Sequence, residues 1–179
     1  MPESSQFKQL FHVGIIAAFA TLAFVGTTII RVPIPATGGY FNLGDTFVMV
    51  AGLLYGPLTG ALVGLIGPTL ADAVGFPQFI LATAVVKFFE GLAVGGLSKS
   101  GKPMGKIVGA LIVGILILVG GYFIFEAFIY PLLAKSIPFF GVTDFNAALA
   151  ELAPNLLQGA LSAVIAFGIW RVFRRSVPS

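Results

Sequence analysis

The sequence predicts an all-α membrane protein with six transmembrane helices and both termini on the cytoplasmic side. Hydrophobic residues make up 58% of the 179 residues and charged residues only 9%, whereas soluble domains carry about 25% charged residues. The mean hydropathy of +1.03 agrees with this composition. Uncharged runs recur along the chain, and about 20 apolar residues are enough to cross the hydrocarbon core of a bilayer. We expect a single membrane domain over residues 1–179.

The first half of the chain holds three expected spans. The run 12–30 is long and apolar, and the segment 31–44 after it is a loop because it carries several prolines and glycines. Residues 45–73 are again almost uncharged but are interrupted by Gly56-Pro57. This break divides them into two short spans, 45–56 and 57–73.

The second half of the chain holds the other three spans, at 79–97, 106–130 and 152–173. A basic loop separates the first two. The longer, mixed segment 131–151 precedes the last span and is expected on the outer side, like the loop 31–44.

The distribution of basic residues favours six spans over five, because cytoplasmic loops carry an excess of lysine and arginine. With five spans, the basic loop and the basic C-terminus would fall on opposite faces of the membrane. With six spans, the outer side holds only Arg31 and Lys135. The cytoplasmic side then holds Lys8, Lys99, Lys102, Lys106, Arg171, Arg174 and Arg175.

Polar side chains at membrane depth are costly and therefore mark candidate functional sites. In the six-span arrangement they gather toward the outer half. Asn155 and Gln158 are three residues apart and share a helix face, as do Lys87 and Glu90. The candidate substrate-binding residues are Tyr40, Asn42, Asp72, Lys87, Glu90, Tyr122, Glu126, Asn155 and Gln158.

Two interpretations of these residues stay open at the level of sequence. Lys87 and Glu90 either form a structural ion pair or contact a ligand, for which Lys87 would meet an anionic group or donate hydrogen bonds. The tyrosines Tyr40 and Tyr122 either belong to the interfacial aromatic belt or stack on a flat ring.

Enzymatic functions find little support. The chain has one histidine and no cysteine, so H-E-x-x-H and thiolate metal sites are excluded. It has no G-x-S-x-G elbow and no phosphate-binding G-x-x-x-x-G-K-[ST] loop. We therefore expect no catalytic residue, no metal and no cofactor, and we expect ATP hydrolysis only in partner subunits.

Several segments together resemble the substrate-binding S components of energy-coupling factor (ECF) vitamin transporters, especially the riboflavin-type group. The resemblance covers roughly residues 12–175 and rests on the order of the segments. These are Gly39-Tyr-Phe-Asn-Leu-Gly-Asp45, Gly56-Pro-Leu-Thr-Gly-Ala-Leu-Val-Gly64, Ala71-Asp72, Val86-Lys-Phe-Phe-Glu-Gly91 and Pro154-Asn-Leu-Leu-Gln-Gly159.

The resemblance implies a subunit of the prokaryotic plasma membrane that captures a vitamin or related cofactor precursor from outside with high affinity. Loop 31–44 would be a lid over an outer pocket between the later helices. The implied partners are a transmembrane coupling subunit and two ATPase subunits. S components dock through small residues on the first helix, and in this sequence the positions that would do so are Gly14, Ala17, Ala18 and Thr21.

Other functions remain possible on the sequence alone. A stand-alone ion- or proton-coupled carrier would use Glu126, Lys87 and Glu90 as a proton relay. A membrane assembly factor would use the small-residue helix faces as its interface and bind no small molecule. The substrate is equally open, because riboflavin, pyridoxine, a pyrimidine precursor of thiamine and pantothenate all fit.

Overall fold

The computed structural model describes residues 5–35, 38–98, 103–140 and 143–175. Within them the chain is helical apart from one short antiparallel hairpin, which confirms the predicted helical class. The elements are α1 (Ser5–Ile29), β1 (Val32–Ile34), β2 (Gly39–Phe41), α2 (Asp45–Tyr55), α3 (Pro57–Gly75), α4 (Ile80–Leu97), α5 (Met104–Ile124), a π-helical turn (Phe125–Ile129), α6 (Tyr130–Ala134) and α7 (Phe145–Phe173), with 3₁₀ turns at Pro77–Phe79 and Pro138–Phe140.

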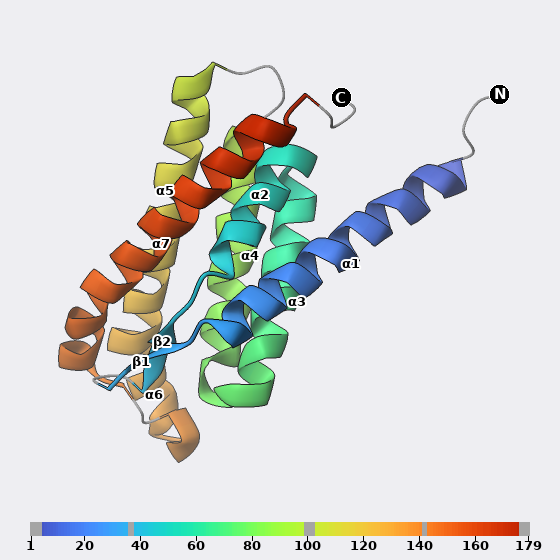
Figure 1. Cartoon of the computed structure of the whole chain (residues 1–179). Helices are drawn as coiled ribbons and strands as arrows, with labels where there is room; N and C mark the ends of the chain where they lie inside the picture. The colour runs from blue at the N-terminus through green and yellow to red at the C-terminus, as the bar shows by residue number, and fades with distance from the viewer. Residues whose placement is uncertain (1–4, 36–37, 99–102, 141–142, 176–179) are drawn as a thin grey trace.

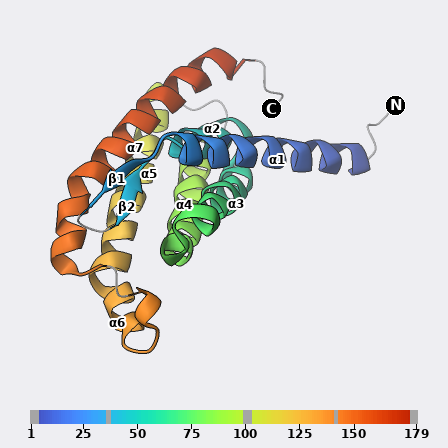
Figure 2. The same ribbon diagram turned by 60° about the horizontal axis from the view of Figure 1, so that its bottom comes forward.

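Helix α1 begins and α7 ends at the same end of the bundle, which is called the terminal end here (Figure 1). The β1–β2 hairpin and α6 lie at the opposite end, called the hairpin end. The first turns of α1 extend away from the other helices (Figure 2). In the described chain, five helical segments are long and apolar enough to cross a membrane, and Asp45–Tyr55 is a shorter apolar helix.

The boundary between α2 and α3 lies at the predicted break. Gly56 has φ 90° and ψ −177°, a conformation that glycine adopts without the steric cost of a Cβ. Pro57 occupies the first turn of α3, where its missing N–H costs no hydrogen bond. The two short helices therefore form because a glycine and a proline stand together.

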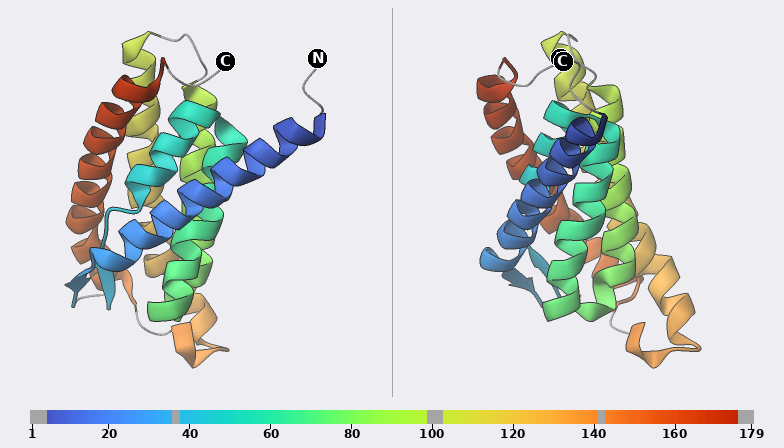
Figure 3. Two further views of the ribbon diagram at one scale, coloured as in Figure 1. Left: turned by 45° about the vertical axis from the view of Figure 1, so that its right-hand side comes forward. Right: turned by 90° about the vertical axis from the view of Figure 1, so that its right-hand side faces the viewer.

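Glycines bring α3 and α4 into close contact, and the two helices run side by side through the bundle (Figure 3). A Cβ added at Gly64 would overlap the Lys87 carbonyl, and one added at Gly91 would overlap the Gly60 carbonyl. Small residues permit such approach between membrane helices. The packing fixes the depth at which α4 presents Lys87 and Glu90 to the interior.

The bundle places apolar side chains outside and polar ones inside. Leu58, Val74, Leu116 and Val164 are more than 60% exposed on the helix surfaces, as expected of lipid-facing positions. The buried polar residues include Asn42, Asp45, Asp72, Thr83, Lys87, Glu90, Glu126, Glu151, Asn155 and Gln158.

Candidate functional site

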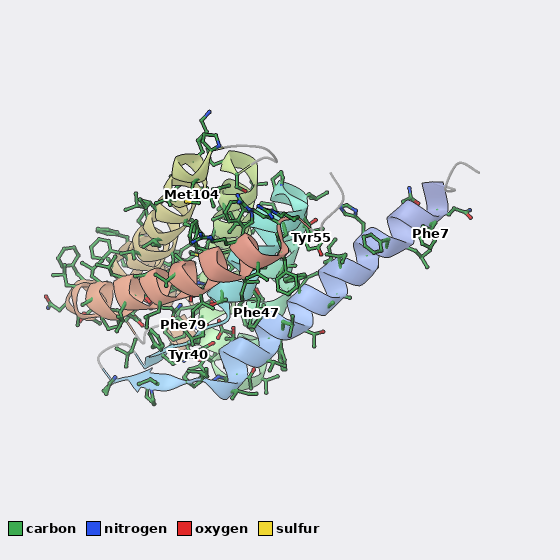
Figure 4. The ribbon with its side chains drawn as sticks, turned by 45° about the horizontal axis from the view of Figure 1, so that its top comes forward. Phe7, Tyr40, Phe47, Tyr55, Phe79 and Met104 are labelled. Atoms are coloured by element: carbon green, nitrogen blue, oxygen red, sulfur yellow. The ribbon has the colours of Figure 1, made fainter. Side chains whose placement is uncertain are left out.

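A small polar cavity of about 30 Å³ lies toward the hairpin end, between the hairpin and helices α3, α5 and α7. Two of its lining rings, Tyr40 and Phe79, are labelled in Figure 4. The described lining residues are Gly39, Tyr40, Asn42, Asp72, Phe79, Tyr122, Glu126, Glu151, Asn155 and Gln158.

Asp72, near the end of α3, is the centre of one hydrogen-bonded group. Its carboxylate accepts hydrogen bonds from the Tyr40 hydroxyl and from Thr83 Oγ1 at 2.5 Å. Thr83 Oγ1 also lies 2.8 Å from the Tyr122 hydroxyl. These contacts join the hairpin to α3, α4 and α5 around one wall of the cavity.

Arg31 links the hairpin to α3. Its guanidinium donates to the Ala71 carbonyl at 2.9 Å and lies 5.1 Å from the centre of the Tyr40 ring, within the range of a cation–π contact. The Tyr40 ring is in turn 4.3 Å from that of Phe76. Burial, together with the neighbouring Asp72 carboxylate, raises the pKa of the Tyr40 hydroxyl far above its ordinary value.

A second hydrogen-bonded group leads from the cavity into the centre of the bundle. The Asn42 backbone N–H donates to Gln158 Oε1 at 2.8 Å, and Gln158 Nε2 donates to Asp45 Oδ2 at 2.7 Å. The Lys87 ammonium lies 2.5 Å from Asp45 Oδ1 and 3.2 Å from Glu90 Oε2. These five residues connect the hairpin, α2, α4 and α7.

Lys87 and Glu90 do not line the cavity, unlike the other predicted site residues. Both are almost fully buried, at 1% and 0% exposure, and are paired with each other and with Asp45. The Lys87 ammonium lies 5.3 Å from the centre of the ring of Tyr122, which does line the cavity. In this structure the pair therefore fits the interpretation as a structural ion pair.

Glu126 reaches the cavity from the π-helical turn Phe125–Ile129. Such turns insert a residue into a helix and often occur at functional sites. The Glu126 side chain is 1% exposed and interacts electrostatically with the side chain of Glu151. Thr143 Oγ1 donates to the Glu126 backbone carbonyl at 3.1 Å, which ties the turn to the start of α7.

The list of predicted site residues omitted Glu151, Phe79 and Gly39, which also line the cavity. Glu151 was detectable, because it lies four residues before Asn155 and thus on the same helix face. Phe79 follows a proline in a turn and Gly39 contributes no side chain, so neither carries a sequence signal of this kind.

The predicted docking residues lie on the outside of α1. Gly14, Ala17, Ala18 and Thr21 are all exposed. The opposite face of the helix packs against α3, where a Cβ on Gly67 would contact Ala20 and Ala23. These four residues are thus not used in packing α1 onto the described part of the bundle.

Comparison with known proteins matches the chain to one family over almost its whole length. The sequence model of the ECF-type riboflavin transporter S component family matches residues 4–175. A relative from Pyrococcus woesei, described as an uncharacterized protein in gap 3'region, is 31% identical over 86% of this chain and 95% of its own length. A solved S component of a bacterial ECF transporter has the same fold, with a TM-score of 0.73 at 18% identity over 96% of this chain and 99% of that one. The chain therefore belongs to the family of ECF-type riboflavin transporter S components.

Proposed function

We propose that this chain is the substrate-binding membrane subunit of an ECF-type importer and captures a vitamin or related cofactor precursor from outside the cell. The observation that carries the proposal is the polar cavity inside an apolar bundle of this family. All the predicted site residues other than Lys87 and Glu90 line that cavity. They come from elements far apart in the sequence, and a common role in binding one ligand explains why they converge.

The proposed orientation places the hairpin end outside and the terminal end in the cytoplasm of a prokaryotic cell. Lys106, Arg171 and Arg174 flank the helices at the terminal end, in agreement with the excess of basic residues on the cytoplasmic side. The cavity then opens toward the side from which an importer receives its substrate.

Substrate entry requires the hairpin to move. Ligand pockets for small molecules enclose about 300–1,000 Å³, whereas this cavity encloses about 30 Å³. The hairpin contributes Tyr40 to the cavity wall, and Asn42 directly follows its second strand. Their contacts with Asp72 and Gln158 are hydrogen bonds that can exchange for bonds to a ligand. We expect the hairpin to act as the lid.

The chain works, in this proposal, with a transmembrane coupling subunit and two ATPase subunits, and docks on the coupling subunit through the small face of α1. A stand-alone proton-coupled carrier is not favoured by the family, and its relay would need Lys87, which is held between two carboxylates.

Ligand binding and uptake together test the function. The purified protein in detergent is screened by thermal shift against a panel of water-soluble vitamins, since a ligand that binds only the folded state raises the melting temperature. We expect one class of compound to shift it, and cellular uptake of that compound to require co-expressed ATPase subunits. Uptake that needs no ATPase subunit and is abolished by an uncoupler would support the carrier instead.

A further inference from the structure

We propose that the substrate is a flat nitrogenous base that is held as a cation, with its N–H groups facing Glu126 and Glu151. The inference rests on the proposed function and names the chemical class of its ligand.

The cavity wall is acidic. Of its described lining residues three are acids, Asp72, Glu126 and Glu151, and none is lysine, arginine or histidine. The nearby Lys87 is already shared by two other carboxylates. Arg31 does not line the cavity; its guanidinium lies against the Tyr40 ring and donates to the Ala71 carbonyl. Because buried charges are normally paired, we expect a positively charged ligand group beside Glu126.

One buried oxygen on the wall has hydrogen-bonding capacity that the described chain does not use. Glu126 Oε2 has no hydrogen-bond partner there. The Asn155 side chain, which is 6% exposed, lines the same cavity. Since about nine-tenths of buried polar groups are hydrogen-bonded, a ligand that donates to Glu126 would complete the site, and Asn155 lies on the same wall.

Glu126 and Glu151 line the same buried cavity. Two carboxyl groups that share such a site hold one proton between them when no cation is bound, because two like charges close together are costly. A neutral base that enters takes this proton: the carboxyl O–H bond breaks, an N–H bond forms, and a carboxylate faces the new cation. The other titratable groups on the wall are Tyr40 from β2, Asp72 from α3 and Tyr122 from α5.

The aromatic side chains on the wall favour a flat cation. Tyr40, Phe79 and Tyr122 line the cavity, and aromatic faces attract both flat rings and cations. An anionic substrate such as pantothenate would add a further carboxylate to an acidic wall. It is therefore disfavoured by the same charges.

A matched set of compounds tests this class. The probes are the aminopyrimidine precursor of thiamine, its oxo analogue, riboflavin and pantothenate. In the oxo analogue a carbonyl oxygen replaces the amino group on the ring. We expect the aminopyrimidine to bind about tenfold or more tightly than its oxo analogue, as loss of one hydrogen bond to a charged group implies. At a pH where the free base is neutral, the calorimetric heat should not depend on the buffer, because the protein supplies the proton.

Variants separate the role of Glu126 and Glu151 in ligand binding from the effect of losing an acidic side chain elsewhere. Glu126→Gln and Glu151→Gln should each weaken aminopyrimidine binding by about tenfold or more. Asp144→Asn is the matched control, because Asp144 is an exposed acid that caps α7 through the Ala147 N–H. Thermal unfolding without ligand shows whether each variant is folded, and the second glutamine variant replaces the first if it is not.

The outcomes distinguish this inference from the proposed function. Saturable binding of riboflavin or pantothenate with no binding of the base would overturn the inference and keep the function. Equal binding of the base and its oxo analogue, or unchanged affinity in both folded glutamine variants, would overturn the inference as well. No saturable binding of any of the four probes would overturn the inference, and it would overturn the function as well if no other water-soluble vitamin of the panel bound.

Discussion

At the scale of single residues, Lys87 shows how a buried charge is tied to its partners. Its ammonium is held by Asp45 and Glu90, and removing one member of a buried ion pair costs about 3–5 kcal/mol. We expect Lys87→Met to lower the free energy of unfolding by about that amount. Thermal or denaturant unfolding in detergent measures it. A Lys87→Met protein of unchanged stability but lost ligand binding would instead make Lys87 a ligand contact.

Tyr40 carries a prediction about pH. Its hydroxyl donates to Asp72, and because its pKa is raised by burial and by that carboxylate, the folded state keeps the proton. The stabilisation should be fully present below the pKa of about 10 for an unfolded tyrosine and should fall as the pH rises above it. At neutral pH the free energy of unfolding of the wild-type protein should exceed that of Tyr40→Phe by about 1.5 kcal/mol. A pH series of unfolding measurements checks this, and a difference that grew above pH 10 would contradict it.

The candidate site could be predicted from sequence where membrane depth makes a polar group costly. That argument found Asp72, Glu126, Asn155 and Gln158, which converge on the cavity. It did not separate ligand contacts from structural partners, because the pairing of Lys87 with Asp45 depends on the packing of α2 against α4. The depth of a residue in the membrane does not reveal which helix packs against it.

At the scale of the elements, the close approach of α3 and α4 predicts a strong effect of one methyl group. A Cβ at Gly64 would overlap the Lys87 carbonyl, and overpacking costs about 1–3 kcal/mol. We expect Gly64→Ala to reduce stability by at least that range. Gly109→Ala on α5 is the control, because nothing lies within 4 Å of a Cβ there. Equal stability of the two variants would show that α3 and α4 can separate without cost.

Helix α1 carries a prediction about the proposed partner. Ala18 is exposed on the small face of α1, so Ala18→Leu should leave ligand binding intact while reducing uptake by cells that co-express the other subunits. Ala73→Leu, at an exposed alanine of α3, is the control and should not alter uptake. If Ala18→Leu transported at the normal rate, the docking face would have to lie elsewhere.

The sequence predicted elements whose signals are local and missed those that depend on contacts. The break at Gly56-Pro57 was readable because both residue types interrupt helices. The β1–β2 hairpin was not, because its strands have three residues each and depend on Arg31 and Tyr40 packing against α3. The π-helical turn Phe125–Ile129 was hidden within an apolar run.

At the scale of the whole molecule, the proposed orientation in the membrane rests on the distribution of basic residues, and it can be tested directly because the chain has no cysteine. Gln6, in α1 at the terminal end, and Ser136, after α6 at the hairpin end, are both exposed. In intact cells a membrane-impermeant maleimide should label Ser136→Cys and not Gln6→Cys, whereas both should react after permeabilisation. The reverse pattern would invert the proposed direction, because the cavity would then face the cytoplasm. Labelling of both in intact cells would place the two ends of the bundle on one side, which six spans do not permit.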